Sequence, residues 1–209
     1  MKFYLSSSKF SDQSHKLAGL MPATNKKIGY IPNALDYTGC NIPIREQKLI
    51  QKFKYLTELG LEPEMLDLRD YFGKETELKT KLQTLGGVFI NGGNTFILRQ
   101  AMRISGFDKI LTELKEQNAD FLYAGYSAAC CILAADMRGL QIVDDPNDHP
   151  YKEIQETIFE GLGFLDYMIL PHFNSNHPEA EDISKEVQYC KQNKIPYKTL
   201  NDGDVIIID

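Results

Sequence analysis

The sequence contains no tryptophan, only four histidines and four cysteines, and no apolar run long enough to cross a membrane. The cysteines are Cys40, Cys130, Cys131 and Cys190, and their spacing fits neither a disulfide framework nor a C-x-x-C metal site. We therefore expect reduced, mostly buried thiols in a cytoplasmic protein. The apolar stretch at the N-terminus is too short for the core of a signal peptide.

Positive charge is scarce as well. Lysine and arginine number 23 against 29 aspartates and glutamates, the net charge is −6, and no basic block occurs. The tyrosines and phenylalanines, eleven of each, are not interleaved with arginine as they are in single-strand binding grooves. With the missing apolar run, these features argue against nucleic acid and membrane partners. We expect a monomer or a homodimer.

Strand-like and helix-like segments alternate along the chain. Its 209 residues suffice for one well-buried domain, and no linker or repeat divides residues 1–209. Strands separated by helices predict an α/β domain of three layers, in which helices cover both faces of a mostly parallel sheet. Strands are predicted at 2–5, 27–31, 64–68, 87–90, 121–125, 166–170 and 205–208, and helices at 11–20, 44–59, 75–85, 95–102, 106–117, 130–135 and 178–191.

One strand end carries a serine between small residues, and in parallel sheets the site forms outside the carboxyl ends of the strands. Residues 123–129 read YAGYSAA, with Gly125 before and Ala128 and Ala129 after Ser127. A nucleophile elbow needs small neighbours, because bulky side chains would collide at a sharp strand-to-helix turn. The backbone N–H groups after the serine then face a developing oxyanion. Ser127 is therefore the candidate nucleophile.

A nucleophilic serine needs a base, and the chain offers four histidines. His172 directly follows the strand predicted at 166–170, whereas His15 lies in the first helix and His149 in an acidic loop. His177 stands near a helix start, and we expect a peripheral role for it at most. A hydrogen-bonded histidine that caps the strand is the structural alternative for His172. Its place at a strand end favours the catalytic role.

The base needs an orienting carboxylate in turn, and spacing alone does not choose it. Asp202 and Asp204 stand just before the last strand, although Asp-Gly is also an ordinary turn dipeptide. The competing carboxylates are Asp144, Asp145, Glu179 and Glu181.

A second loop at a strand end, residues 90–95 with the sequence INGGNT, contains Gly92 and Gly93. Two glycines let backbone N–H groups approach a ligand closely, as a phosphate cradle or as half of an oxyanion hole. The loop lacks the lysine and hydroxyl residue of a P-loop, so an oxyanion donor facing Ser127 is the better interpretation. A helix start capped by Asn94 or Thr95 is the alternative. The serine-rich stretch 5–9 is a weaker candidate for anion binding.

Three motifs together resemble a known family. GGNT at 92–95, GYSAA at 125–129 and PHFN at 171–174 follow the order seen in the serine peptidases that include dipeptidase E and cyanophycinase. The resemblance runs from about the first strand to the last. This family is similar in fold to the class I glutamine amidotransferases, a flavodoxin-like arrangement, with a serine in place of their cysteine.

The resemblance implies a role for each matching residue. It makes Ser127 the nucleophile, His172 the base and Asp202 the acid. It further implies an oxyanion hole and substrate contacts, and it requires no metal and no organic cofactor. The oxyanion hole would be formed by Gly92 or Gly93 with Ala128, and the substrate contacts by Asn94 and Asn174.

The sequence departs from the family pattern in several places. Ala129 replaces the last glycine of the elbow motif, and Asp202 replaces a glutamate. The aspartyl-specific dipeptidases carry an arginine after the catalytic histidine, where the stretch 179–187 offers only Lys185. The chain also ends at Asp209, where relatives continue.

The leading hypothesis is a serine hydrolase that cleaves a small peptide. A non-catalytic relative that binds a small ligand at the same strand ends is the alternative, motivated by Ala129 and Asp202. A third possibility is an esterase of the α/β-hydrolase type with the chain order Ser127, then Asp144 or Asp145, then His172.

Overall fold

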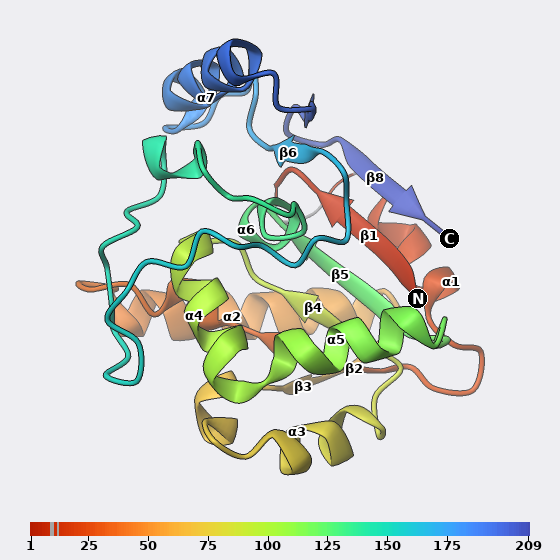
Figure 1. Cartoon of the computed structure of the whole chain (residues 1–209). Helices are drawn as coiled ribbons and strands as arrows, with labels where there is room; N and C mark the ends of the chain where they lie inside the picture. The colour runs from red at the N-terminus through yellow and green to blue at the C-terminus, as the bar shows by residue number, and fades with distance from the viewer. Residues whose placement is uncertain (9–10, 12) are drawn as a thin grey trace.

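The computed structural model describes residues 1–8, 11 and 13–209, and a six-stranded sheet forms its centre (Figure 1). Its strand order is β3-β2-β4-β5-β1-β8, and every pairing is parallel except that of β8 with β1. Because β8 returns against β1, the two chain termini lie near each other. The strands are β1 (Lys2–Ser6), β2 (Lys27–Ile31), β3 (Glu62–Met65), β4 (Gly87–Ile90), β5 (Leu122–Tyr126) and β8 (Val205–Ile208).

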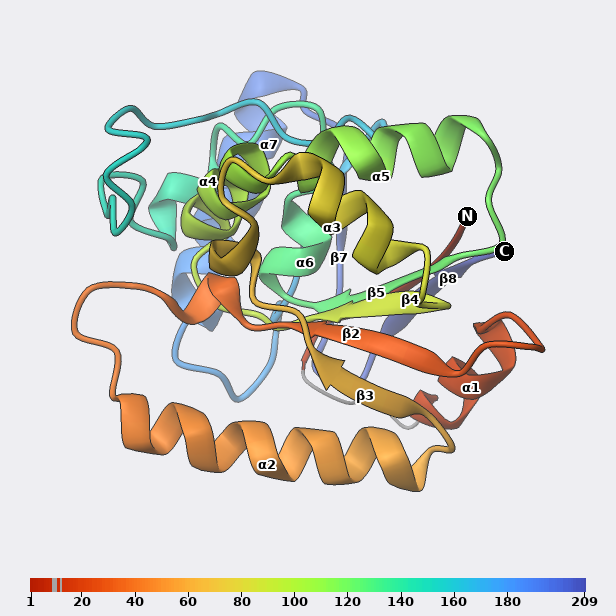
Figure 2. The same cartoon turned by 90° about the horizontal axis from the view of Figure 1, so that it is seen from below.

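Helices cover both faces of this sheet, as Figure 2 shows. On one face lie α1 (Leu17–Leu20) and α2 (Ile42–Glu58). The opposite face carries α3 (Glu75–Leu82), α4 (Thr95–Ser105), α5 (Phe107–Glu116) and α6 (Ala128–Cys131). Within the described part of the chain, four short 3₁₀ helices join these elements: η1 (Ser14–Lys16), η2 (Asn33–Leu35), η3 (Leu68–Tyr71) and η4 (Leu140–Ile142). Among the described residues, no helix has the length and apolar character to span a bilayer.

The core consists of two buried clusters, one on each face of the sheet. In β1, Phe3 and Leu5 belong to the cluster under α3–α6, and Tyr4 between them belongs to the cluster under α1 and α2. This division follows from the period of two in a strand, where successive side chains point to opposite faces. Burial on both faces explains why these strands read as continuous apolar runs rather than as alternating patterns.

The remaining elements form a smaller unit with a two-stranded sheet of its own, which contacts α6. β6 (Met168–Leu170) pairs in parallel with β7 (Tyr197–Thr199), and α7 (Ala180–Asn193) connects the two strands. The strand predicted at 166–170 is therefore present but does not join the main sheet. β7 was not predicted, since three residues carry too little periodicity.

The three-layer α/β architecture is confirmed, while several boundaries differ from the predictions. The helix predicted at 11–20 is helical only from η1 through α1, and Asp12 lies outside the described residues. The strand predicted at 64–68 ends at Met65, because the Asp67 side chain accepts a hydrogen bond from the Arg69 N–H and starts η3. The helix predicted at 130–135 ends at Cys131.

Candidate active site

Ser127 occupies a sharp turn between β5 and α6. Its φ of 52° and ψ of −112° lie in a region that non-glycine residues rarely adopt. The Ser127 N–H donates to the Ser6 carbonyl at 3.2 Å, and the Ser127 carbonyl accepts from the Cys130 N–H at 2.7 Å. These bonds hold the serine in a strained conformation of the kind that concentrates at functional sites.

The small residues around Ser127 are required by close packing. A Cβ atom at Gly125 would lie 2.5 Å from the Ala129 Cβ and 2.6 Å from the Ile90 carbonyl oxygen. No side chain fits at position 125, and Ala129 fills the space on the helix side of the turn. The elbow therefore accommodates alanine at the last position of the motif.

His172 follows β6 and contacts a carboxylate from the turn before β8. Its Nδ1 lies 2.7 Å from Asp202 Oδ1, and the residue is only 4% exposed. An ionised carboxylate at this distance places the imidazole proton on Nδ1, so that Nε2 is the proton acceptor. Ser127, His172 and Asp202 all line one cavity of about 710 Å³.

Three of the other candidate carboxylates are engaged elsewhere. An oxygen of Asp204 accepts from the Asn201 N–H at 2.8 Å, and one of Asp145 accepts from the Asn147 N–H at 2.9 Å. Asp144 accepts from the Thr95 N–H at 2.8 Å. Glu181 on α7 has an 88% exposed side chain. Of the candidate carboxylates, all of which lie in the described part of the chain, only Asp202 is hydrogen-bonded to the His172 ring.

Ser7 is part of this arrangement, and the sequence did not single it out as such. The Ser7 Oγ accepts from the His172 N–H at 2.8 Å and lies 3.1 Å from Asp202 Oδ1. The residue is fully buried. The sequence signal that could have pointed to Ser7 was the serine-rich stretch 5–9, a weak candidate for anion binding. The anionic group that Ser7 contacts is the Asp202 carboxylate of the chain itself. Lys9 of that stretch lies outside the described residues.

His177 stacks on the face of His172, with ring centroids 3.8 Å apart and planes 9° from parallel. It is thus closer to the base than the sequence suggested. The ligand atoms of His172, His177 and Glu179 lie within 4.8 Å of one another, so these are the residues that could hold a metal. A metal ion needs to lie near the plane of each ligating imidazole, and one ion cannot lie in two stacked parallel planes. The stack therefore suits ring packing better than metal binding.

The glycine loop lies against the nucleophile. A Cβ atom at Gly92 would approach the Ser127 Cβ to 2.9 Å, and one at Gly93 would approach the Ala34 carbonyl oxygen to 2.3 Å. Gly93 also has a φ of +147°. Both glycines line the same cavity as Ser127. Ala128 opens α6, so its N–H has no partner within the helix and remains suited to an oxyanion.

The two asparagines proposed as substrate contacts have different surroundings. Asn94 caps α4, because its Oδ1 accepts from the N–H groups of Phe96 and Ile97, and its Nδ2 donates to the Asp145 carbonyl. With both ends of its amide engaged, Asn94 serves the helix, and this arrangement does not support the substrate contact. Asn174 is exposed, with a φ of +49°, and its contact stays a prediction.

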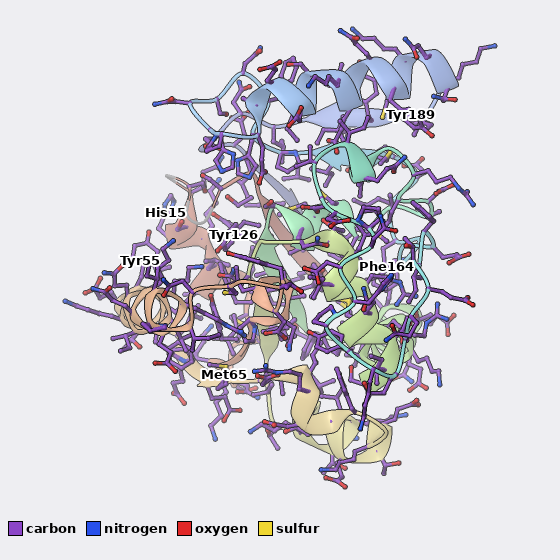
Figure 3. All side chains as sticks on the ribbon, turned by 90° about the vertical axis from the view of Figure 1, so that its left-hand side faces the viewer. His15, Tyr55, Met65, Tyr126, Phe164 and Tyr189 are labelled. Atoms are coloured by element: carbon purple, nitrogen blue, oxygen red, sulfur yellow. The ribbon has the colours of Figure 1, made fainter. Side chains whose placement is uncertain are left out.

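A polar cluster beside Gly92 was also missed. The buried Asn91 Oδ1 accepts from the hydroxyls of Tyr30 (2.5 Å) and Tyr126 (2.6 Å), and Lys52 donates to Asn91 and Tyr126. Burial raises the pKa of Tyr126 above its usual range, so the phenol stays neutral. Tyr126 and Tyr55 of α2 lie on the same side of the molecule (Figure 3). A second cavity of about 620 Å³ continues past this cluster, since Lys52 and Tyr126 line both cavities.

The adjacent cysteines next to the elbow are packing residues. Cys130 and Cys131 are buried, and their Sγ atoms lie 3.3 Å and 3.4 Å from the carbonyl oxygens of Ser6 and Ile169. Burial raises the pKa of each thiol above its usual range. Neither thiol is suited to nucleophilic attack, since the thiolate is the reactive form.

The glycine loop, the serine elbow and the histidine after β6 occur on this fold in the order found in a known peptidase family. The sequence pattern that defines Peptidase family S51 matches residues 3–209. The chain belongs to peptidase family S51. This membership confirms the family resemblance and makes the chain a peptidase.

Individual relatives of this S51 peptidase are also named as peptidases. It is 31% identical over 172 residues to the uncharacterized peptidase Lmo0363 of Listeria monocytogenes, and this match covers 81% of this chain and 77% of that protein. It is 25% identical over 134 residues to Peptidase E of Streptomyces coelicolor, and this match covers 62% of this chain and 51% of that protein.

Solved structures show the same architecture. The crystal structure of a Listeria monocytogenes protein described as a candidate Peptidase E superposes on the S51 chain with a TM-score of 0.74 at 26% identity, covering 99% of this chain and 93% of the other. A peptidase from an acI-B1 Actinobacterium shares the fold with a TM-score of 0.63 at 15% identity, covering 99% and 82%.

Proposed function

We propose that this S51 peptidase is a serine-type enzyme that hydrolyses small peptides through Ser127, His172 and Asp202. The observation that carries the proposal is the 2.7 Å contact between His172 Nδ1 and Asp202 Oδ1, at a cavity that Ser127 also lines. A buried base oriented by a carboxylate, beside a serine in a strained turn, is the arrangement that activates a hydroxyl for acyl transfer.

The acylation step follows from these positions. The Ser127 Oγ attacks the scissile carbonyl while His172 Nε2 accepts its proton, and the imidazolium then gives that proton to the leaving amine. Asp202 keeps the imidazole in the required tautomer and stabilises the imidazolium. N–H groups at Gly93 and Ala128 would bind the tetrahedral oxyanion, and each donor in comparable sites contributes roughly 3–4 kcal/mol.

Hydrolysis of the acyl-enzyme uses the same groups. His172 Nε2 takes a proton from a water molecule as that water attacks the ester carbonyl, and it returns the proton to Ser127 as the ester bond breaks. The two joined cavities, of about 710 and 620 Å³, have the size of small-ligand sites, which supports a short peptide as the substrate.

Labelling with a fluorophosphonate tests the proposal directly. These probes react with activated serines, so intact-mass analysis of the wild-type protein should show one adduct, which Ser127→Ala abolishes. Hydrolysis of short peptides should fall by at least about a thousandfold in the same variant, since triad members act as a unit. Folded wild-type protein that forms no adduct would instead favour a ligand-binding protein without catalysis.

A further inference from the structure

Two lysines of α2 line the cleft of the proposed triad. Lys48 and Lys52 border both the 710 Å³ cavity that contains Ser127 and the adjoining 620 Å³ cavity. They are four positions apart on one helix, and such residues lie on the same helix face. We name these two residues the lysine pair. The lysine pair therefore stands where the two cavities meet, on the α2 side of the nucleophile.

Contacts hold Lys52 next to the turn that carries the nucleophile. Its Nζ donates to Asn91 Oδ1 and to the Tyr126 hydroxyl, and it lies 4.8 Å from the centre of the Tyr126 ring. Tyr126 directly precedes Ser127 in the chain. A Cβ atom at Gly92 would lie 2.7 Å from the Tyr126 ring and 2.9 Å from the Ser127 Cβ. The ammonium group of Lys52 thus lies against a ring that packs beside the elbow.

The other cations of the 620 Å³ cavity are already paired. Arg45 Nη1 lies 2.6 Å from Asp36 Oδ1, and the Arg69 guanidinium lies against Asp67. Lys48 is exposed and forms no ion pair within the described part of the chain. It is therefore able to meet a negative group of a ligand.

Acidic groups lie on the other side of Ser127. A cavity of about 10 Å³ is lined by Ser127 together with Asp144, Glu179 and Glu186. Its walls come from α7 and from the face of the sheet that carries α4 and α6, whereas α2 covers the opposite face (Figure 2). Like charges repel, so a carboxylate of a bound peptide is favoured on the α2 side of the nucleophile.

We propose that the lysine pair binds the C-terminal carboxylate of the leaving residue, so that the enzyme selects peptides in which one amino acid follows the scissile bond. This inference rests on the proposed function, because it takes Ser127 as the attacking group. Consecutive residues are about 3.8 Å apart, so the carboxylate of a single leaving residue stays close to the elbow. The side chain of that residue would enter the 620 Å³ cavity, whose apolar walls include Leu35, Leu49 and Met65.

Binding to the Ser127→Ala variant tests this site without relying on turnover. Calorimetry with a panel of Xaa-Leu dipeptides and their C-terminal amides should show at least about tenfold tighter binding of the free acid for the peptides that bind. Xaa-Asp amides carry a carboxylate on the side chain alone and should bind no better than the Xaa-Leu amides. Equal binding of acid and amide, binding of neither, or tight binding of the Xaa-Asp amides would overturn the inference.

Variants of the lysine pair locate the effect. In the Ser127→Ala background, Lys52→Gln and Lys48→Gln should each weaken binding of the free acid about fivefold or more and leave the amide unchanged. Lys54→Gln, whose side chain on the same helix is 79% exposed, is the matched control and should change neither. Lys48 makes no contact with Asn91 or Tyr126, so its variant tests the site even if Lys52→Gln lowers stability. An acid preference that persists in both variants contradicts the assignment.

Fluorophosphonate labelling of Lys48→Gln with Ser127 intact keeps the two proposals apart. Labelling that persists in wild type and variant, with no acid preference in either background, leaves the serine mechanism standing and removes the carboxylate site. An acid preference that depends on the lysine pair, in a protein that is never labelled, has the opposite meaning.

Discussion

At the residue scale, the contact between His172 and Asp202 distinguishes Asp202 from the five other carboxylates that were candidates to orient the base. Aspartate is one methylene shorter than the glutamate of related peptidases, yet the turn before β8 brings its Oδ1 within 2.7 Å of His172 Nδ1. Ser7 adds a hydroxyl 3.1 Å from the same oxygen and accepts from the His172 N–H. The shorter acid is therefore compatible with a positioned base.

Asp202→Asn should lower kcat by about 10³–10⁴-fold, because an amide can donate to Nδ1 and stabilise the wrong tautomer. Peptide hydrolysis and the rate of fluorophosphonate labelling both measure this loss. Asp204→Asn, in the same turn, is the matched control and should stay near wild type. Asp145→Asn tests the esterase order, and a larger loss in this variant than in Asp202→Asn would reassign the acid.

At the element scale, β5, α6 and α4 position the site, and their starts are set by local chemistry. The elbow between β5 and α6 needs Gly125 because a Cβ there would collide with Ala129 and with β4. The start of α4 needs Asn94, whose Oδ1 accepts from two N–H groups of the first turn. The sequence offered both a cap and a substrate contact for Asn94, and the structure supports the cap.

Asn94→Ala should lower the free energy of unfolding by roughly 1–2 kcal/mol through loss of this cap. Urea denaturation measures the loss, and Asn94→Ser should recover most of it. The KM for peptide substrates should stay close to wild type in both variants. A large rise in KM with unchanged stability would return Asn94 to the substrate site.

At the scale of the whole molecule, the unit formed by β6, α7 and β7 closes the site from outside the main sheet. It supplies Glu179 and Glu186, whereas His172 follows β6 directly. α7 packs against η4 and β6, Glu186 is buried, and burial is the largest cause of its raised pKa. The stability of the whole fold should therefore depend on pH through this side chain.

The sign of that dependence follows from proton binding. The pKa of Glu186 rises from its ordinary 4.5 to about 9, so between these values the folded protein binds a proton that the unfolded chain releases. The free energy of unfolding should fall as pH rises through this window, by at most about 1.4 kcal/mol per pH unit. The negative charges of Asp144, Glu179 and Asp182 add to the raised pKa of Glu186.

Glu186→Gln removes the contribution of this proton to the pH dependence of stability, whereas the other titrating groups remain in both proteins. Urea denaturation at pH 5.5 and 8.5 should show the variant gaining about 2–4 kcal/mol relative to wild type at the higher pH. Parallel pH profiles for the two proteins would contradict a proton held at Glu186.

The sequence by itself determined the three-layer α/β architecture, the elbow at Ser127 and the choice of His172, because apolar periodicity, small residues at a turn and a residue at a strand end are local signals. Spacing left several carboxylates open and the family resemblance implied Asp202, and it is the tertiary structure that brings Asp202 to His172 and adds Ser7 to them. Their contacts with His172 cross 30 and 165 positions of the chain. It also decided that Asp144 gathers with Glu179 and Glu186 beside Ser127, since burial of a side chain is a property of what packs over it.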